Sequence, residues 1–200
     1  RTLWIASVAS NIGSWMHEVG AGWLMTSLAP NPLMVALVQA ATTAPVFLLA
    51  LPAAALADIV DRRRYLITAQ VWMLAMAATL GVLTLAGLTT APLLLLFTFA
   101  LGIGNAMMMP AWGAITPELV PRAQLQAAIG LNSMGLNVAR AVGPALAGVI
   151  VAAAGPGAVF VLNAVSFIAV IAALRHWQRP PTASGLPAER LAGAVRAGLR

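Results

Sequence analysis

The sequence contains no cysteine and no lysine, and charged residues fill only 8% of its 200 positions. Without cysteine there is no disulfide framework, no thiol nucleophile and no thiolate metal site. An average soluble domain is about half apolar and about a quarter charged, whereas this chain is 61% apolar. So few charges cannot cover the surface of a soluble protein of this length. An apolar medium must therefore contact much of the protein surface in place of water.

Long apolar stretches predict an all-α polytopic membrane bundle. A helix needs about 20 predominantly apolar residues to cross a hydrocarbon core about 30 Å thick. Six stretches reach that length: Leu3–Leu28, Leu33–Ala57, Tyr65–Leu88, Ala91–Gly113, Leu125–Ala154 and Pro156–Leu174. We therefore predict six transmembrane helices within residues 1–178. We expect both ends of this sequence to be cut from a longer chain, because it begins at Arg1 and ends at Arg200 inside a helix-like stretch.

The arginines alternate between successive loops. Every arginine except Arg140 falls on one side of the predicted bundle, and the opposite loops carry none. The basic side holds Arg1, Arg62, Arg63, Arg64, Arg122 and the arginines from Arg175 to Arg200; the other loops lie around Pro30, Thr89 and Gly155. The positive-inside rule then places both ends in the cytoplasm and the protein in the inner or plasma membrane. These arginines are interpreted as topology signals and lipid headgroup contacts, and no nucleic-acid partner is expected.

Two of the predicted spans carry a polar face. Ser7, Asn11, Ser14 and Glu18 recur every three or four residues, a spacing that puts them on one side of a helix. The span at 125–154 repeats this spacing with polar and small residues. Because ionisable residues inside a membrane are costly, they mark candidate functional sites. The residues predicted to line a substrate or coupling cavity are Asn11, Ser14, Glu18, Asn105, Ser133, Asn137 and Arg140.

Helix packing is the alternative for parts of these faces. Small residues allow two helices to approach closely, and polar side chains can hydrogen-bond across the contact. We expect packing at Gly143 and Gly148, and bending of the helices at Pro45 and Pro144. His17 could titrate near neutral pH, but it is interpreted as a bystander at the membrane interface.

Catalytic and metal motifs are incomplete. His17 and Glu18 begin an H-E-x-x-H pattern, but Ala21 stands where the second histidine is required. Ser133 lacks a G-x-S-x-G frame. Asp58 and Asp61 form a single acidic pair, whereas a magnesium-dependent membrane prenyltransferase would need two acid-rich loops. We predict no enzyme, no metal and no cofactor, with a prenyl- or phosphotransferase as a remote alternative.

The segment 54–64, between the second and third predicted spans, is the most specific part of the chain. It resembles the signature loop of the major facilitator superfamily, G-x-L-a-D-r-x-G-R-r, with Ala54 in place of the first glycine and Asp61 in place of the second. In that family the loop holds the inward face shut. The resemblance implies a gate made of Asp58, Asp61, Arg62, Arg63, Arg64 and Glu118. A turn that only determines topology is the alternative.

Other segments resemble one branch, the exporters related to enterobactin and macrolide efflux proteins, or transmembrane secretion effector group. Residues 10–16 are close to the S-N-x-G-D-W-M of that branch, with Ser14 in its acidic position. Residues 117–122 resemble the connection between its fourth and fifth spans. Residues 137–148 resemble its fifth helix, including a Gly-Pro-x-x-x-Gly element like an antiporter motif.

This resemblance implies one half of a transporter. Superfamily members usually have twelve spans, with a three-plus-three inverted repeat in each six-helix half. Residues 1–178 would be the amino-terminal half, and residues 179–200 a cytoplasmic linker with a basic amphipathic helix. The partners expected are membrane lipids, a small-molecule substrate and the missing carboxy-terminal half. We expect this half to be unable to transport on its own.

The implied function is proton-coupled export of small amphipathic molecules, such as drugs or siderophores, by alternating access. The energy source would be a proton gradient. The alternative is a non-transporting helical scaffold or assembly subunit, which would have a dry centre.

Overall fold

The computed structural model describes residues 2–177, apart from the side chains of Asp58, Ala114 and Glu118. The predicted linker at 179–200 lies outside the described residues. The described part is all-α, as predicted. Its elements are α1 (Thr2–Leu28), α2 (Pro32–Ile59), α3 (Arg62–Leu85), α4 (Ala91–Leu119), the short 3-10 helix η1 (Arg122–Gln124) and α5 (Leu125–His176).

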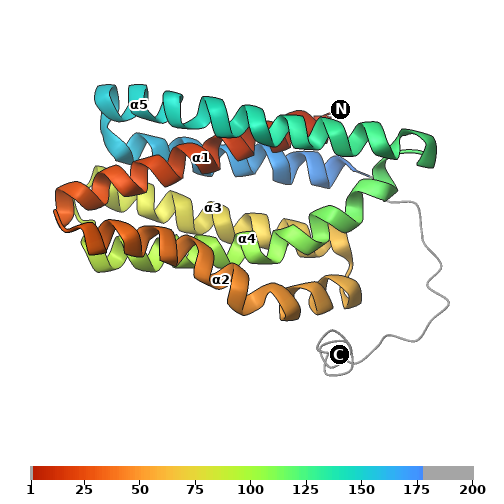
Figure 1. Cartoon of the computed structure of the whole chain (residues 1–200), viewed down its shortest axis with the longest axis horizontal. Coiled ribbons are helices and arrows are strands. Elements are labelled where there is room, and N and C mark those ends of the chain that lie inside the picture. The colour runs from red at the N-terminus through yellow and green to blue at the C-terminus, as the bar shows by residue number, and fades with distance from the viewer. Residues whose placement is uncertain (1, 178–200) are drawn as a thin grey trace.

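The helix α5 is not one continuous rod. Gly155 has a φ of 77° and a ψ of 170°, a backbone region that essentially only glycine adopts, and Pro156 follows it. The chain turns back at this point, so the second half of α5 runs beside the first half (Figure 1). The break separates the two stretches that the sequence predicted at 125–154 and 156–174.

The helical segments lie side by side along the long axis of the molecule (Figure 1). The start of α1, the α2–α3 turn, the α4–α5 connection and the end of α5 lie at one end of the bundle. The α1–α2 turn, the α3–α4 turn and the break in α5 lie at the other. The helix α1 packs on α5, α2 packs on α4, and α3 packs on both α4 and α5. The arginines of the loops are therefore brought together at one end.

Within the described residues, four helical segments are long and apolar enough to cross a membrane. They are Pro32–Ala57, Arg62–Leu85, Ala91–Pro117 and Arg122–His176, the last of which contains the break at Gly155. The helix α1 has sufficient length, at 27 residues, but carries the polar face described above. Large apolar side chains such as Phe47, Leu48 and Val149 are exposed on the outside of the bundle, as a lipid-facing surface requires.

Several helix bounds differ from the sequence prediction, those of α3 and α4 by the most. The helix α3 begins at Arg62 rather than Tyr65, because the side chain of Asp61 accepts a hydrogen bond from the backbone N–H of Arg64 at 2.9 Å and so caps the helix. The helix α4 continues to Leu119 rather than ending at Gly113, although Pro110 and Pro117 lie within it. Membrane helices tolerate proline, since neighbouring groups can satisfy the freed backbone.

A row of small residues forms the contact between α5 and α1. Gly135, Ala139, Gly143 and Ala147, spaced one turn apart, are all buried. A Cβ atom on Gly143 would lie 2.6 Å from the Cβ of Trp15, so the two helices approach closely here. A Cβ atom on Gly148 would meet no atom of this chain within 4 Å. Gly143 therefore sits at a packing contact of the bundle, and Gly148 faces open space.

Candidate functional site

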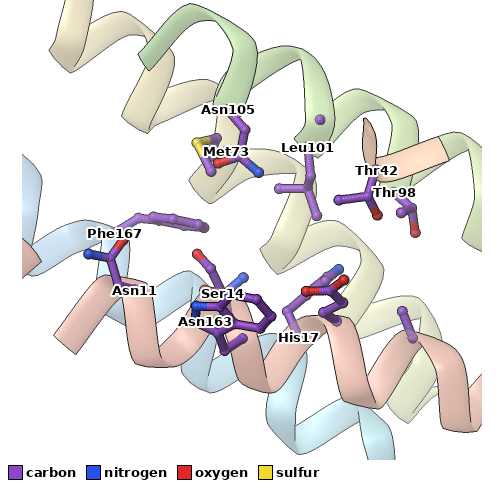
Figure 2. A pocket seen from close by; sticks show the side chains of 14 residues that line it. Asn11, Ser14, His17, Thr42, Met73, Thr98, Leu101, Asn105, Asn163 and Phe167 are labelled. Carbon is purple, nitrogen blue, oxygen red and sulfur yellow. The ribbon is translucent and has the colours of Figure 1, made fainter. Parts of the chain in front are cut away.

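A polar cavity of about 200 Å³ lies between α1, α2, α3, α4 and the second half of α5 (Figure 2). Its walls mix amide, hydroxyl, imidazole and carboxyl groups with a few apolar side chains. The polar lining residues are Asn11, Ser14, His17, Glu18, Thr42, Thr98, Asn105 and Asn163. The larger apolar lining residues are Trp15, Met73, Leu101 and Phe167.

The helix α1 supplies one side of this cavity. Asn11, Ser14 and Glu18 lie on one helical face because they are three and four residues apart, and all three line the cavity. Figure 2 shows Ser14 and His17 on the same side as Asn163, with Thr42 and Thr98 across from them. Three of the predicted cavity residues on α1 are thus brought together with groups from four other helical segments.

Two glycines allow the helices to close around the cavity. A Cβ atom on Gly13 would lie 2.8 Å from Oδ1 of Asn163, so glycine lets α1 approach the second half of α5. A Cβ atom on Gly102 would lie 2.9 Å from the carbonyl oxygen of Thr42 and 3.1 Å from that of Ala41. Pro45 has no N–H to donate to the Ala41 carbonyl four residues earlier. The close contact between α2 and α4 therefore forms where Pro45 frees a carbonyl and Gly102 leaves room for it.

Three side chains at the cavity are buried without a hydrogen-bond partner in the part of the chain that the structure describes. The exposed fractions are 7% for His17, 4% for Thr98 and 2% for Asn163. The unpartnered atoms are both ring nitrogens of His17, Oγ1 of Thr98 and Oδ1 of Asn163. Thr42, on the same cavity, differs because its hydroxyl donates to the carbonyl of Val38 at 3.0 Å. A buried polar group without a partner costs about 1–3 kcal/mol. These side chains can therefore gain stability by forming hydrogen bonds with a molecule in the cavity.

The cavity adjoins an open groove of about 600 Å³. The cavity and the groove share the lining residues Asn11, Trp15 and Asn105, so they lie side by side. The groove adds apolar walls, including Met108 and Trp112.

A second space adjoins the groove toward one end of the bundle. It measures about 630 Å³ and shares Ser7, Trp112, Thr116 and Asn132 with the groove. This space reaches Gln124, in η1. The spaces beside the polar cavity therefore extend toward the end of the bundle where the loop arginines gather.

The predicted polar face of the first half of α5 lies elsewhere. Ser133, Asn137 and Arg140 are exposed and line neither the cavity nor the groove. The helix turns its row of small residues toward α1, and the polar residues consequently face outward. The guanidinium of Arg140 stacks over the ring of Trp15, with its Cζ 5.4 Å from the ring centroid, a cation–π arrangement. The polar faces of α1 and α5 do not meet within the described residues.

The loop between α2 and α3 is short, and Arg63 connects it to the end of α5. Nε of Arg63 donates to the carbonyl oxygen of Leu174 at 2.8 Å, and Nη2 donates to the carbonyl oxygen of Arg175. A positive charge at a helix C-terminus is stabilising because the last carbonyls there are unpaired. The signature loop implied a gate here; the contacts described for Arg63 are with backbone carbonyls.

Replacing Arg63 by glutamine is expected to lower the free energy of unfolding by about 1.5–3 kcal/mol, the usual worth of hydrogen bonds to charged groups. The side chain of Arg64 is exposed and makes no hydrogen bond within the described residues, so Arg64→Gln is the matched control. Thermal unfolding of the purified protein in detergent, followed by circular dichroism, measures the difference. Equal destabilisation by the two variants would contradict the capping role of Arg63.

Three polar residues of the cavity were not predicted from the sequence, and a fourth was set aside. Thr42, Thr98 and Asn163 were not singled out, and His17 was interpreted as a bystander. A signal was present for two of them: Asn163 is the only amide between residues 156 and 174, and Thr98 lies two helical turns before Asn105. Only the packing of the helices shows that these residues face one space.

Comparisons with known proteins agree with the resemblance found in the sequence. A family model described as transmembrane secretion effector matches residues 1–200. The staphyloferrin A transporter of Staphylococcus aureus (strain NCTC 8325 / PS 47) is 31% identical over 166 residues, which cover 82% of this chain and 42% of that protein. An uncharacterized MFS-type transporter of Bacillus subtilis (strain 168), YfiS, is 26% identical over 167 residues, or 83% of this chain and 39% of that protein. The chain spans about two fifths of the length of these curated relatives.

Proposed function

Since the chain belongs to the transmembrane secretion effector family, within the major facilitator superfamily of multi-pass membrane transporters, we propose that it forms the amino-terminal half of an exporter. This exporter would carry small amphipathic molecules by alternating access, with a proton gradient as its energy source. The observation that carries the proposal is the polar cavity within the bundle, which adjoins an open groove. A scaffold that only packs its helices has no need of such a space.

We propose that the half crosses the membrane six times. The helix α1 is one crossing, α2, α3 and α4 are three more, and the break at Gly155 divides α5 into the last two. The alternation of the turns between the two ends of the bundle supports this (Figure 1). The gathered loop arginines support a cytoplasmic position for the end at which they lie. The two groups of three crossings would be the inverted repeats of this fold.

The site residues have three proposed roles. Asn11, Ser14 and Asn105 contact substrate, because they line the cavity and two of them also line the groove. Glu18 takes part in proton coupling, because it is the one carboxylate on the cavity. Ser133, Asn137 and Arg140 belong to the outward polar face of α5, which the second half of the protein would cover. The gate consists of Asp58, Asp61, Arg62, Arg63, Arg64 and Glu118.

Similarity to one relative supports including siderophores in the proposed substrate class. The Staphylococcus aureus relative is a staphyloferrin A transporter. A cavity with many hydrogen-bonding groups next to a groove with tryptophan and methionine walls suits a molecule that has a polar end and an apolar body.

A transport assay on the complete protein in proteoliposomes tests the proposal. Asp58→Asn and Arg140→Ala are each expected to lower the rate of proton-driven efflux by about tenfold or more, which corresponds to a rise of about 1.4 kcal/mol in the barrier. Leu48→Ala, at an exposed apolar position on α2, serves as the control and is expected to keep the full rate. Unchanged efflux in both charge variants at equal expression would overturn these residue assignments.

A further inference from the structure

We propose that His17, Thr98 and Asn163 form a subsite for an uncharged head group that both donates and accepts hydrogen bonds, such as a hydroxyl or an amide. This inference rests on the proposed function, because the head group would belong to the transported amphipathic molecule. The three residues come from α1, α4 and the second half of α5 and line one cavity (Figure 2). Each is at least nine-tenths buried and has a polar atom without a partner within residues 2–177.

The inventory of donors and acceptors selects the head group. A neutral imidazole offers one donor and one acceptor, a hydroxyl offers both, and the side-chain oxygen of Asn163 only accepts. A carboxylate head cannot donate, so it leaves Oδ1 of Asn163 unpaired. An ammonium head cannot accept, so it leaves the N–H of the His17 ring unpaired. A hydroxyl or an amide can satisfy both kinds of group.

The charge of the cavity argues against an anionic head group. Glu18 is the only carboxylate among the lining residues, and no arginine lines the cavity. Arg140 stacks on Trp15 but is not part of the lining. An anionic head would therefore meet a like charge at Glu18 and no cation, a combination that is unfavourable at short range in a medium of low polarity.

The size of the cavity fits a head group and not a whole molecule. Pockets for drug-sized ligands usually measure about 300–1,000 Å³, and this cavity measures about 200 Å³. The rest of the ligand would lie in the adjoining groove, which shares Asn11, Trp15 and Asn105 with the cavity. Met108, Trp112 and Leu136 supply apolar walls there for the body of the ligand.

Four dansyl probes with the same body and different heads test the subsite. The heads are a hydroxyl (N-hydroxyethyl dansylamide), its methyl ether (N-methoxyethyl dansylamide), a carboxylate (dansylglycine) and an ammonium (N-aminoethyl dansylamide). Binding to the complete protein in lipid nanodiscs is measured by dansyl emission sensitised by tryptophan, with empty nanodiscs as the blank. We expect the hydroxyl probe to bind about fivefold more tightly than the ether, as one net hydrogen bond allows, and more tightly than either charged probe.

Two threonines on the same cavity provide a matched pair of variants. Thr98→Val is expected to reduce the preference for the hydroxyl probe, because one of the groups that can accept from the head is lost, while leaving the affinity for the ether within about twofold, since the shape is kept. Thr42→Val is expected to retain the preference, because the hydroxyl of Thr42 already donates to Val38. Thr98→Ser, which restores a hydroxyl, should restore the preference.

The outcomes separate this inference from the function on which it rests. Equal binding of all four probes, tighter binding of a charged probe, or equal loss of preference in the two valine variants would overturn the head-group subsite and leave the exporter proposal standing. No binding of any probe would overturn the subsite and count against the exporter proposal as well.

Discussion

Leucine in place of Gly143 is expected to destabilise the bundle severely. A Cβ atom at this position would lie 2.6 Å from the Cβ of Trp15 and 3.1 Å from the carbonyl oxygen of Ile12. Both obstacles belong to or adjoin the backbone of α1, so they cannot yield by a simple side-chain rotation. Overpacking of this kind costs about 1–3 kcal/mol, and the thermal midpoint should fall by about 2–12 °C for a chain of this length. Thermal unfolding of the purified chain in detergent measures this.

Gly148→Leu is the matched control. It lies on the same helix five residues later, and a Cβ atom there would meet nothing of this chain within 4 Å. We expect its thermal midpoint to match that of the unmodified chain. Similar losses for both leucine variants would mean that helix propensity or membrane insertion, and not the contact with Trp15, decides the stability.

A cysteine introduced at Asn105 is expected to react rapidly with a water-soluble maleimide. The chain contains no cysteine of its own, and Asn105 lines both the polar cavity and the open groove. Because the reactive species is the thiolate, which forms in water and not in an apolar interior, the labelling rate reports hydration. Ala77 is fully buried among apolar side chains of α3, α4 and α5. We expect Asn105→Cys to react at least about tenfold faster than Ala77→Cys.

This comparison also separates a transporter from a scaffold. A non-transporting bundle with a dry centre predicts that both cysteines are unreactive. Labelling is followed by mass shift on the complete protein in membrane vesicles, with any cysteines of the rest of the protein replaced. Slow reaction at both positions, in protein that inserts and folds normally, would favour the scaffold.

The break in α5 could be predicted from the local sequence. The two apolar stretches on either side of Gly155 and Pro156 were predicted as separate spans, and the structure breaks the helix there. Glycine and proline restrict or release the backbone locally, so their effect can be anticipated from the sequence. The cap at Asp61 is equally local, since its acceptor lies three residues from the N–H that it binds.

The contacts made by the polar faces could not be predicted from the sequence. The faces of α1 and of the first half of α5 follow the same spacing, and both were expected to meet water or each other. The face of α1 lines the cavity, whereas Ser133, Asn137 and Arg140 point outward, because the row of small residues at Gly135 and Gly143 packs against α1 instead. Helical periodicity tells which residues share a face, but not which neighbour that face will contact.

The sequence by itself determined the all-α character of the protein, its long apolar helices, the break at Gly155 and the arginines at alternate turns, because each depends on composition or on neighbouring residues. The tertiary structure decided which polar groups meet. His17, Thr98 and Asn163 are separated by more than sixty residues from one to the next and share a cavity only because close helix contacts at Gly13 and Gly102 bring their helices together. The energy of those contacts depends on residues that are far apart in the sequence. Local sequence patterns therefore cannot predict them.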